Sequence, residues 1–150
     1  MERQQPTKTL SEMSFEEIVP GMYLGEGTYQ VTREAIARFA RLLNYDDPIY
    51  FDEDHARRTS YGGIITPPGM LFIYGLKLGW ELKLYPPGAI RMGDDNTYYT
   101  PAHPGDVLTT TITVSERFER KQRKFLKIKL ETTNQRQEPV CTVDFTTIIP

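Results

Sequence analysis

The sequence predicts an α+β domain in which a curved antiparallel sheet packs against one long apolar helix. The order of elements is the first sign: a strand and three helical segments come early, and four strand-like segments follow in succession. Strands that are grouped rather than alternating with helices favour antiparallel pairing. The helical segment between residues 67 and 84 is the second sign, because it is apolar on nearly every side, as in an enclosed helix.

Length and composition limit the classes of protein to which the chain can belong. Its 150 residues are 39% hydrophobic and 25% charged, with a net charge of -2. One folded domain is therefore expected, and nucleic acid is not an expected partner because no basic field is present. Residues 1–14 are polar and are predicted to be a loose segment, which leaves residues 15–150 as the domain.

Few residues are available for a metal or disulfide site. Cys141 is the one cysteine, and the histidines are His55 and His103. We expect no metal and no disulfide within the chain. The start lacks an apolar signal region, which favours a cytoplasmic location, and the apolar stretch over 64–84 is too interrupted by Pro, Gly and charges to suggest a membrane partner.

The first elements form a strand and an amphipathic helix. Residues 19–31 combine glycines with the strand-favouring Tyr23 and Thr28 and predict a strand. Thr32 is placed as a helix N-cap. The helix after it has apolar residues at i, i+3, i+4 and i+7, which are Ile36, Phe39, Ala40 and Leu43.

A short helical flap and the central helix follow. Pro48 ends the amphipathic helix region, and Asp52 is placed to cap a second, short helix. After Gly62 and Gly63, the prolines before Gly69 begin the apolar helix. A Pro-Pro-Gly sequence at 86–88 ends it.

Period-two alternation then predicts the remaining strands. Leu108 and Ile112, for example, alternate with threonines in a pattern typical of a half-buried antiparallel strand. Polar residues 116–124 and 134–139 are expected to be the connections. The strands are predicted over 97–100, 107–114, 125–133 and 140–149.

Two segments, 39–71 and 96–114, together resemble the MaoC-like branch of the hotdog superfamily, the (R)-specific enoyl-thioester hydratases and dehydratases. The first contains Asp-Pro-x-Tyr-Phe-Asp-Glu and Pro-Pro-Gly-Met, and the second contains Pro-Gly-Asp-x-Leu. The resemblance covers roughly residues 15–149. It implies a hotdog fold and an acyl-CoA or acyl-carrier thioester as substrate or ligand, with no metal or redox cofactor.

The chain departs from this family at the catalytic dyad. In catalytic members the flap has the pattern Gly-Asp-x-Asn-Pro-x-His, which falls here on residues 44–50. Tyr45 occupies the Asp position and Tyr50 the His position, although Pro48 matches. A phenol, with a pKa of ~10, is a poor base for activating water at neutral pH. The resemblance therefore implies a lobe that is non-catalytic by itself.

Three other residues are candidates for displaced acid or base groups: Asp46, Asp47 and His55. The aspartates also suit the end of a helix and a solvated turn, and a solvated surface histidine is common on a short helix. Both interpretations stay open at this point. His103, in a turn between strands, reaches a thioester only if that loop folds over the site.

The family's substrate-binding positions fall on Tyr61, Gly62, Gly63, Gly69 and Met70. A free N–H at Gly69, at the positive end of the helix, would polarise a thioester carbonyl, although Gly69 also suits close packing. The apolar helix either lines an acyl tunnel or belongs to the core. Its candidate lining residues are Met70, Phe72, Ile73, Tyr74, Leu76 and Trp80.

The first functional hypothesis is a non-catalytic, acyl-binding subunit of a heteromeric enoyl-CoA hydratase or 3-hydroxyacyl-thioester dehydratase of fatty-acid, polyketide or steroid side-chain metabolism. It pairs with a dyad-bearing hotdog subunit as a heterodimer or heterotetramer. The second is a homodimeric hydratase that uses the displaced residues. The third is an acyl-thioester binding or scaffold module in a thiolase-like complex. All three require dimerisation, because a single hotdog leaves a sheet edge uncovered.

Overall fold

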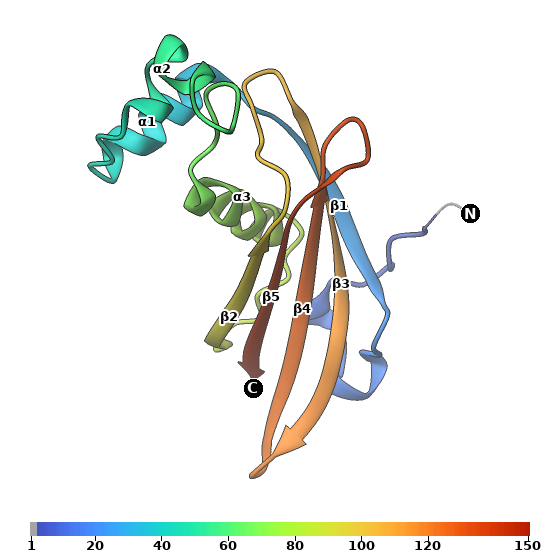
Figure 1. Ribbon diagram of the computed structural model, residues 1–150. Helices are drawn as coiled ribbons and strands as arrows, with labels where there is room; N and C mark the ends of the chain where they lie inside the picture. The colour runs from blue at the N-terminus through green and yellow to red at the C-terminus, as the bar shows by residue number, and fades with distance from the viewer. Residues whose placement is uncertain (1–2) are drawn as a thin grey trace.

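The computed structural model describes residues 3–150. Five antiparallel strands form one sheet in the order β1-β3-β4-β5-β2, and α3 lies across one face of it (Figure 1). The predicted architecture of a curved antiparallel sheet on an apolar helix is confirmed. The strands are β1 (Tyr23–Gln30), β2 (Ile90–Tyr98), β3 (Val107–Arg120), β4 (Arg123–Thr133) and β5 (Pro139–Ile149).

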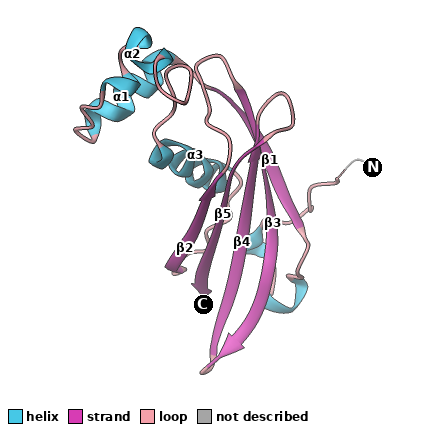
Figure 2. Cartoon of the chain, viewed as in Figure 1, coloured by secondary structure: helices cyan, strands magenta, loops and turns pink. Residues whose placement is uncertain are grey.

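The helices divide into a central one and a flap. The central helix is α3 (Pro68–Glu81), and the flap consists of α1 (Arg33–Leu42), the 3-10 turn η3 (Pro48–Tyr50) and α2 (Glu53–Arg57). The flap lies beyond one end of the sheet, on the side where α3 begins (Figure 2). The predicted caps are present, since Thr32 accepts from the Ala35 N–H and Asp52 from the His55 N–H.

The core occupies the inner face of the sheet. Alternate residues of β3, β4 and β5, such as Ile112, Leu126 and Phe145, are buried there, as period-two alternation requires. A second cluster joins the flap to the start of α3 through Ile36, Ile49, Met70 and several neighbours. The flap is therefore held by apolar burial and not by the sheet's hydrogen bonds.

The N-terminal segment differs from the prediction that residues 1–14 are loose. Leu10 is only 2% exposed and joins the inner-face core. It lies in a 3-10 turn, η1 (Leu10–Glu12), in which Glu12 accepts from the Thr9 N–H. One buried leucine and a capped turn are enough to attach this segment. Residues 1 and 2 of that expectation lie outside the described part of the chain.

Two strand boundaries also differ. β2 begins at Ile90, seven residues before the predicted start at 97, and β3 and β4 extend until only Lys121 and Gln122 connect them. Most of the residues 116–124, expected to be a connection, therefore belong to the strands at the tip of a long hairpin. Lys121 and Gln122 have φ of 50° and 60°, the left-handed values that two-residue hairpin turns need.

Helix α3 is enclosed on one side only within this chain. Gly75 and Gly79 face inward, while Ile73 is 48% and Trp80 70% exposed. The prediction that other structure encloses α3 thus holds for its inner side alone. No helix in residues 3–150 is long and apolar enough to cross a membrane.

Candidate functional site

The flap brings the two tyrosines at the family's dyad positions together. Tyr45 follows α1 and is 41% exposed, whereas Tyr50 lies in η3 and is half-buried. Their ring centroids are 6.1 Å apart. Asn44 ends α1 with a φ of 55°, a left-handed conformation typical of helix C-termini, so the chain turns directly into Tyr45.

The electrostatics of Tyr50 keep it neutral. Burial raises the pKa of its phenol above the usual value, and Asp47, Tyr45 and Tyr61 raise that pKa further. Burial and nearby anions both penalise the phenolate. At neutral pH this hydroxyl can donate or accept a hydrogen bond but is not a base of useful strength.

The displaced acid and base candidates have different local roles. Asp47 caps η3, because its Oδ1 accepts from the Ile49 N–H at 2.9 Å. Asp46 is exposed and makes no hydrogen bond or ion pair with residues 3–150. His55 lies in the first turn of α2, partly buried. The geometry gives Asp47 a structural task, and the Asp52 carboxylate beside His55 has one too, because it caps α2.

A separate polar group surrounds Gly63. An added Cβ there would lie 3.5 Å from Glu53 Oε1 and 3.7 Å from His103 Nδ1, so these two side chains flank the glycine. His103 Nδ1 donates to the Ile64 carbonyl at 2.8 Å. Since a carbonyl only accepts, the neutral ring has its proton on Nδ1 and a free lone pair on Nε2. Glu53 itself is held by Arg33 at 2.7 Å and Arg57 at 3.2 Å.

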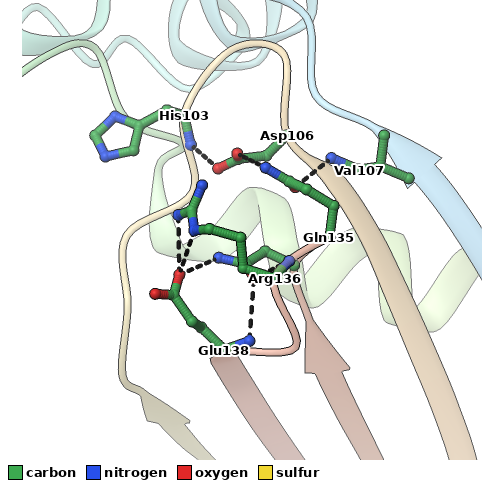
Figure 3. A network of polar contacts seen from close by, with 7 residues as sticks. His103, Asp106, Val107, Gln135, Arg136 and Glu138 are labelled. Carbon is green, nitrogen blue, oxygen red and sulfur yellow. Dashed lines mark hydrogen bonds and ion pairs between the residues drawn. The ribbon is translucent and has the colours of Figure 1, made fainter.

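The turn that carries His103 is anchored by Asp106 (Figure 3). Asp106 is 7% exposed and accepts from the His103 N–H at 2.8 Å and from Gln135 Nε2 at 2.9 Å. Gln135 also accepts from the Val107 N–H at 3.0 Å. These two hydrogen bonds satisfy the hydrogen-bonding needs of the buried Asp106 carboxylate. The Pro-Gly-Asp sequence thus fixes the loop beside the flap to the β4–β5 connection.

The predicted binding residues lie around the start of α3. Gly62 has a φ of 73° and Gly63 is buried, which shapes the chain between flap and helix, and Tyr61 is exposed at 48%. Met70 is 1% exposed and belongs to the core. The Gly69 N–H donates to none of the residues described from 3 to 150, and the Phe39 ring lies beside Gly69, 3.7 Å from where a Cβ would be. The N–H is therefore free to donate to a ligand.

Two cavities are relevant, and they lie apart. A groove of about 690 Å³ runs over the flap between α1 and η3, where Tyr50 and Phe51 form part of its wall and Arg41 lies 5.4 Å from the Phe51 ring centroid. A second cavity of about 460 Å³ lies at the other end of α3. Its lining includes Leu76, Trp80, Tyr85, Arg91 and Phe145.

Sequence reasoning missed Arg91 and gave His103 little weight. Arg91 lies 4.5 Å from the Phe72 ring centroid and pairs with Asp94 at 2.6 Å. The Phe72 contact has no signal in the local sequence, because it depends on β2 lying next to α3, whereas the pair with Asp94 forms between residues three apart on β2. For His103 a signal existed, since the buried Asp of a Pro-Gly-Asp turn fixes the backbone N–H of the residue immediately before that turn. Of the predicted tunnel residues, only Leu76 and Trp80 line the second cavity.

Comparison with known proteins places this chain among dehydratase-like sequences. The family model "FAS1-like, dehydratase domain region" matches residues 19–143. A UPF0336 protein of Streptomyces avermitilis is 32% identical over 92 residues, which are 57% of this chain and 61% of that protein. The match thus spans about three fifths of that relative.

Solved structures share the fold at low sequence identity. A MaoC-like dehydratase from Rhodospirillum rubrum has a TM-score of 0.76 and 24% identity, covering 89% of this chain and 94% of that one. The HadBC complex of Mycobacterium tuberculosis, a 3R-hydroxyacyl-ACP dehydratase, has a TM-score of 0.75 and 21% identity, covering 87% and 96%. The predicted hotdog fold is confirmed.

Proposed function

This chain belongs to the FAS1-like, dehydratase domain region family, and from that premise we propose that it is the acyl-binding, non-catalytic subunit of a heteromeric enoyl-thioester hydratase or 3-hydroxyacyl-thioester dehydratase. The catalytic acid and base would come from a second hotdog subunit. The observation that carries the proposal is the pair Tyr45 and Tyr50, two phenols in place of the Asp and His of the family's dyad.

The chemistry of hydration explains why this pair matters. Adding water to an enoyl thioester needs a base that takes a proton from water and an acid that protonates the α-carbon. Burial raises the Tyr50 pKa, and the neighbouring acidic groups raise it further, so that the phenolate needed to act as a base is scarcely present at neutral pH. Two nearby carboxylates are engaged elsewhere, because Asp47 is used as a cap and Glu53 is held by two arginines.

Other parts of the site support binding rather than bond breaking. The unpaired Gly69 N–H at the start of α3 would donate to a thioester carbonyl oxygen in this proposal. The exposed side of α3, with Ile73 and Trp80, offers apolar surface to an acyl chain or to a partner's helix. A subunit of this kind holds substrate while its partner acts on it.

Association with a second hotdog subunit is supported by uncovered surfaces. β2 forms one edge of the sheet, and Ile90 and Met92 on it are 58% and 57% exposed. An open edge with apolar side chains favours pairing with another strand. The similarly folded HadBC dehydratase is itself a complex.

The test is hydration of a short trans-2-enoyl-CoA, followed by the loss of its conjugated thioester absorbance. The purified chain should bind the thioester in calorimetry and show no turnover, and a dyad-bearing hotdog partner should restore it. Turnover by the chain alone would contradict the proposal and favour a homodimeric hydratase acting through Asp46, Asp47 or His55. Binding without turnover alongside every hotdog partner tried would favour a scaffold module.

A gain-of-function variant sharpens this test. Tyr45→Asp combined with Tyr50→His supplies the missing acid and base at the family's positions. We expect this double variant to hydrate enoyl-CoA measurably above the parent, since a positioned acid–base group contributes about 10²–10⁴-fold. Tyr45→Asn with Tyr50→Gln is the matched control, which has similar size but no titrating group and should stay inactive.

A further inference from the structure

The cavity at the end of α3 has mostly apolar walls and one charged side chain. Its volume is about 460 Å³, and it lies between α3, the loop after that helix and the strands β2 and β5. The rings of Trp80, Tyr85 and Phe145 form part of its wall. Among the residues described from 3 to 150, Arg91 is the only charged one that lines it. A cavity of this size, with apolar walls and few polar groups, is typical of a small-molecule site.

Arg91 reaches this cavity because of its register at the start of β2. It lies opposite Thr147 of β5, which is buried on the inner face of the sheet. Its guanidinium carbon lies 4.5 Å from the Phe72 ring centroid and 5.6 Å from that of Phe145, and its Nη2 pairs with Asp94 at 2.6 Å. Two aromatic rings and an ion pair therefore fix the position of the guanidinium.

Most of the hydrogen-bond donors of Arg91 are unused. A guanidinium has five N–H donors, and the bond to Asp94 is the one that it forms with residues 3–150. The Tyr85 and Thr147 hydroxyls, which also line the cavity, already donate to backbone carbonyls at 3.4 Å and 3.2 Å. Hydrogen bonds from an ionised donor are stronger than those between neutral groups. Arg91 is therefore the strongest donor available to a ligand in this cavity.

The pair with Asp94 decides which kind of ligand oxygen suits Arg91. Asp94 Oδ2 also accepts from Asn96 Nδ2 at 2.7 Å, so the carboxylate is held beside the guanidinium. Arg91 and Asp94 together have no net charge. A carboxylate on a ligand would lose its hydration and face the negative charge of Asp94. A hydroxyl or keto oxygen accepts the same hydrogen bond without bringing a charge into the cavity.

We propose that this cavity holds the far end of an acyl group that carries a neutral oxygen, a hydroxyl or keto group, which accepts a hydrogen bond from Arg91. This rests on the proposed function and narrows its substrate class from acyl thioesters to oxygenated ones. Arg91 is the specificity-determining residue. A site built to bond such an oxygen discriminates against a plain alkyl end, because its donor then loses water and gains no partner.

The test compares dodecanoyl-CoA with two derivatives that carry a hydroxyl or a carboxylate at the ω end. Calorimetry gives the Kd of each, and Trp80 emission reports that the cavity is occupied. We expect wild type to bind the ω-hydroxy thioester about tenfold more tightly than dodecanoyl-CoA, as one hydrogen bond to a charged group allows, and the ω-carboxylate no more tightly than dodecanoyl-CoA. Arg91→Met should lose the preference for the hydroxyl and keep the affinity for dodecanoyl-CoA. Arg136→Met, which breaks an arginine–glutamate pair outside the cavity, is the control and should keep the preference.

Asp94→Asn tests the role of the charge. It leaves Arg91 without its counter-charge, so this variant should bind the ω-carboxylate most tightly.

Three outcomes would overturn the proposal: equal binding of the plain and ω-hydroxy thioesters by wild type, a preference for the hydroxyl that survives Arg91→Met, or a wild-type protein that binds the ω-carboxylate most tightly. If wild type binds no thioester at all, the proposed function fails, and octanol then tests the cavity by itself. Trp80 emission should respond to octanol at about tenfold lower concentration in wild type than in Arg91→Met. An equal response in both proteins would overturn the role of Arg91 as well.

Discussion

Tyr50 illustrates how one side chain's surroundings decide its chemistry. It lies in a 3-10 turn that Asp47 caps through the Ile49 N–H. The same aspartate raises the Tyr50 pKa, as do burial, Tyr45 and Tyr61. The cap that shapes the turn therefore also stabilises the protonated phenol, and local structure and electrostatics work in the same direction.

The raised pKa of Tyr50 has a consequence for stability at alkaline pH. The folded-state pKa lies above the unfolded one, so its contribution to stability is fully present below the ordinary phenol pKa of about 10 and is lost as pH rises through the folded-state pKa. The free energy of unfolding should therefore fall more steeply above about pH 10 in wild type than in Tyr50→Phe. Urea unfolding at a series of pH values above and below this point measures how steeply the free energy of unfolding falls. Tyr99→Phe, which removes an exposed phenol, should keep the wild-type slope, and equal slopes in all three proteins would contradict the prediction.

The sequence predicted the local helix caps of the flap better than the contacts between distant segments. Caps could be predicted because a side chain bonds its own neighbours, and Thr32 and Asp52 do so. The meeting of Glu53 and His103 around Gly63 joins three segments that are far apart in the chain. Spacing along a sequence carries no information about such a meeting.

At the scale of elements, α3 approaches the loop after it closely through Gly79. A Cβ at Gly79 would overlap the Tyr85 ring, with the Tyr85 Cζ at 2.8 Å. The Tyr85 hydroxyl donates to the Leu76 carbonyl at 3.4 Å, and its ring lies 6.0 Å from Phe145. The glycine thus lets helix, loop and β5 meet.

Gly79→Ala should therefore destabilise the protein. Helix propensity alone would favour alanine by about 1 kcal/mol, but overpacking against Tyr85 costs about 1–3 kcal/mol. We expect a lower midpoint in urea and in thermal unfolding. Gly93→Ala, where nothing lies within 4 Å of the new Cβ, is the control and should change stability little. A more stable Gly79→Ala variant would show that the ring moves away freely.

The strands show where periodicity succeeds and fails. β4 and β5 alternate between a buried and a solvated face, so their extents were close to the predictions. β2 is exposed along its whole length, so its sequence Ile-Arg-Met-Gly-Asp-Asp-Asn shows no alternation and looks like a turn. β3 and β4 extend beyond their predicted ends, and the tight turn was missed because Lys121 and Gln122 occupy left-handed positions that usually hold Asn or Gly.

At the scale of the whole molecule, polar and apolar features occupy opposite ends of α3. The flap lies where the helix begins (Figure 1). The Gly69 N–H and the His103 turn lie at the same end, and the cavity with Trp80 and Arg91 lies at the other. A helix of 14 residues separates them, which corresponds to about 20 Å. On the proposed function, a thioester bound at the first end would reach the second only with a long acyl chain.

Trp80, the single tryptophan, allows the reach of the acyl chain along α3 to be measured directly. It is 70% exposed and lines the 460 Å³ cavity, so a bound acyl tail would change its emission. We expect dodecanoyl-CoA to shift Trp80 fluorescence and butanoyl-CoA to leave it unchanged. By calorimetry, Trp80→Ala should weaken dodecanoyl-CoA binding about tenfold through lost apolar contact, with butanoyl-CoA affinity preserved. Val19→Ala, which truncates an exposed apolar side chain outside this cavity, is the control. If Trp80→Ala weakens the binding of dodecanoyl-CoA and butanoyl-CoA equally, the acyl tail lies elsewhere and Trp80 belongs to the subunit interface.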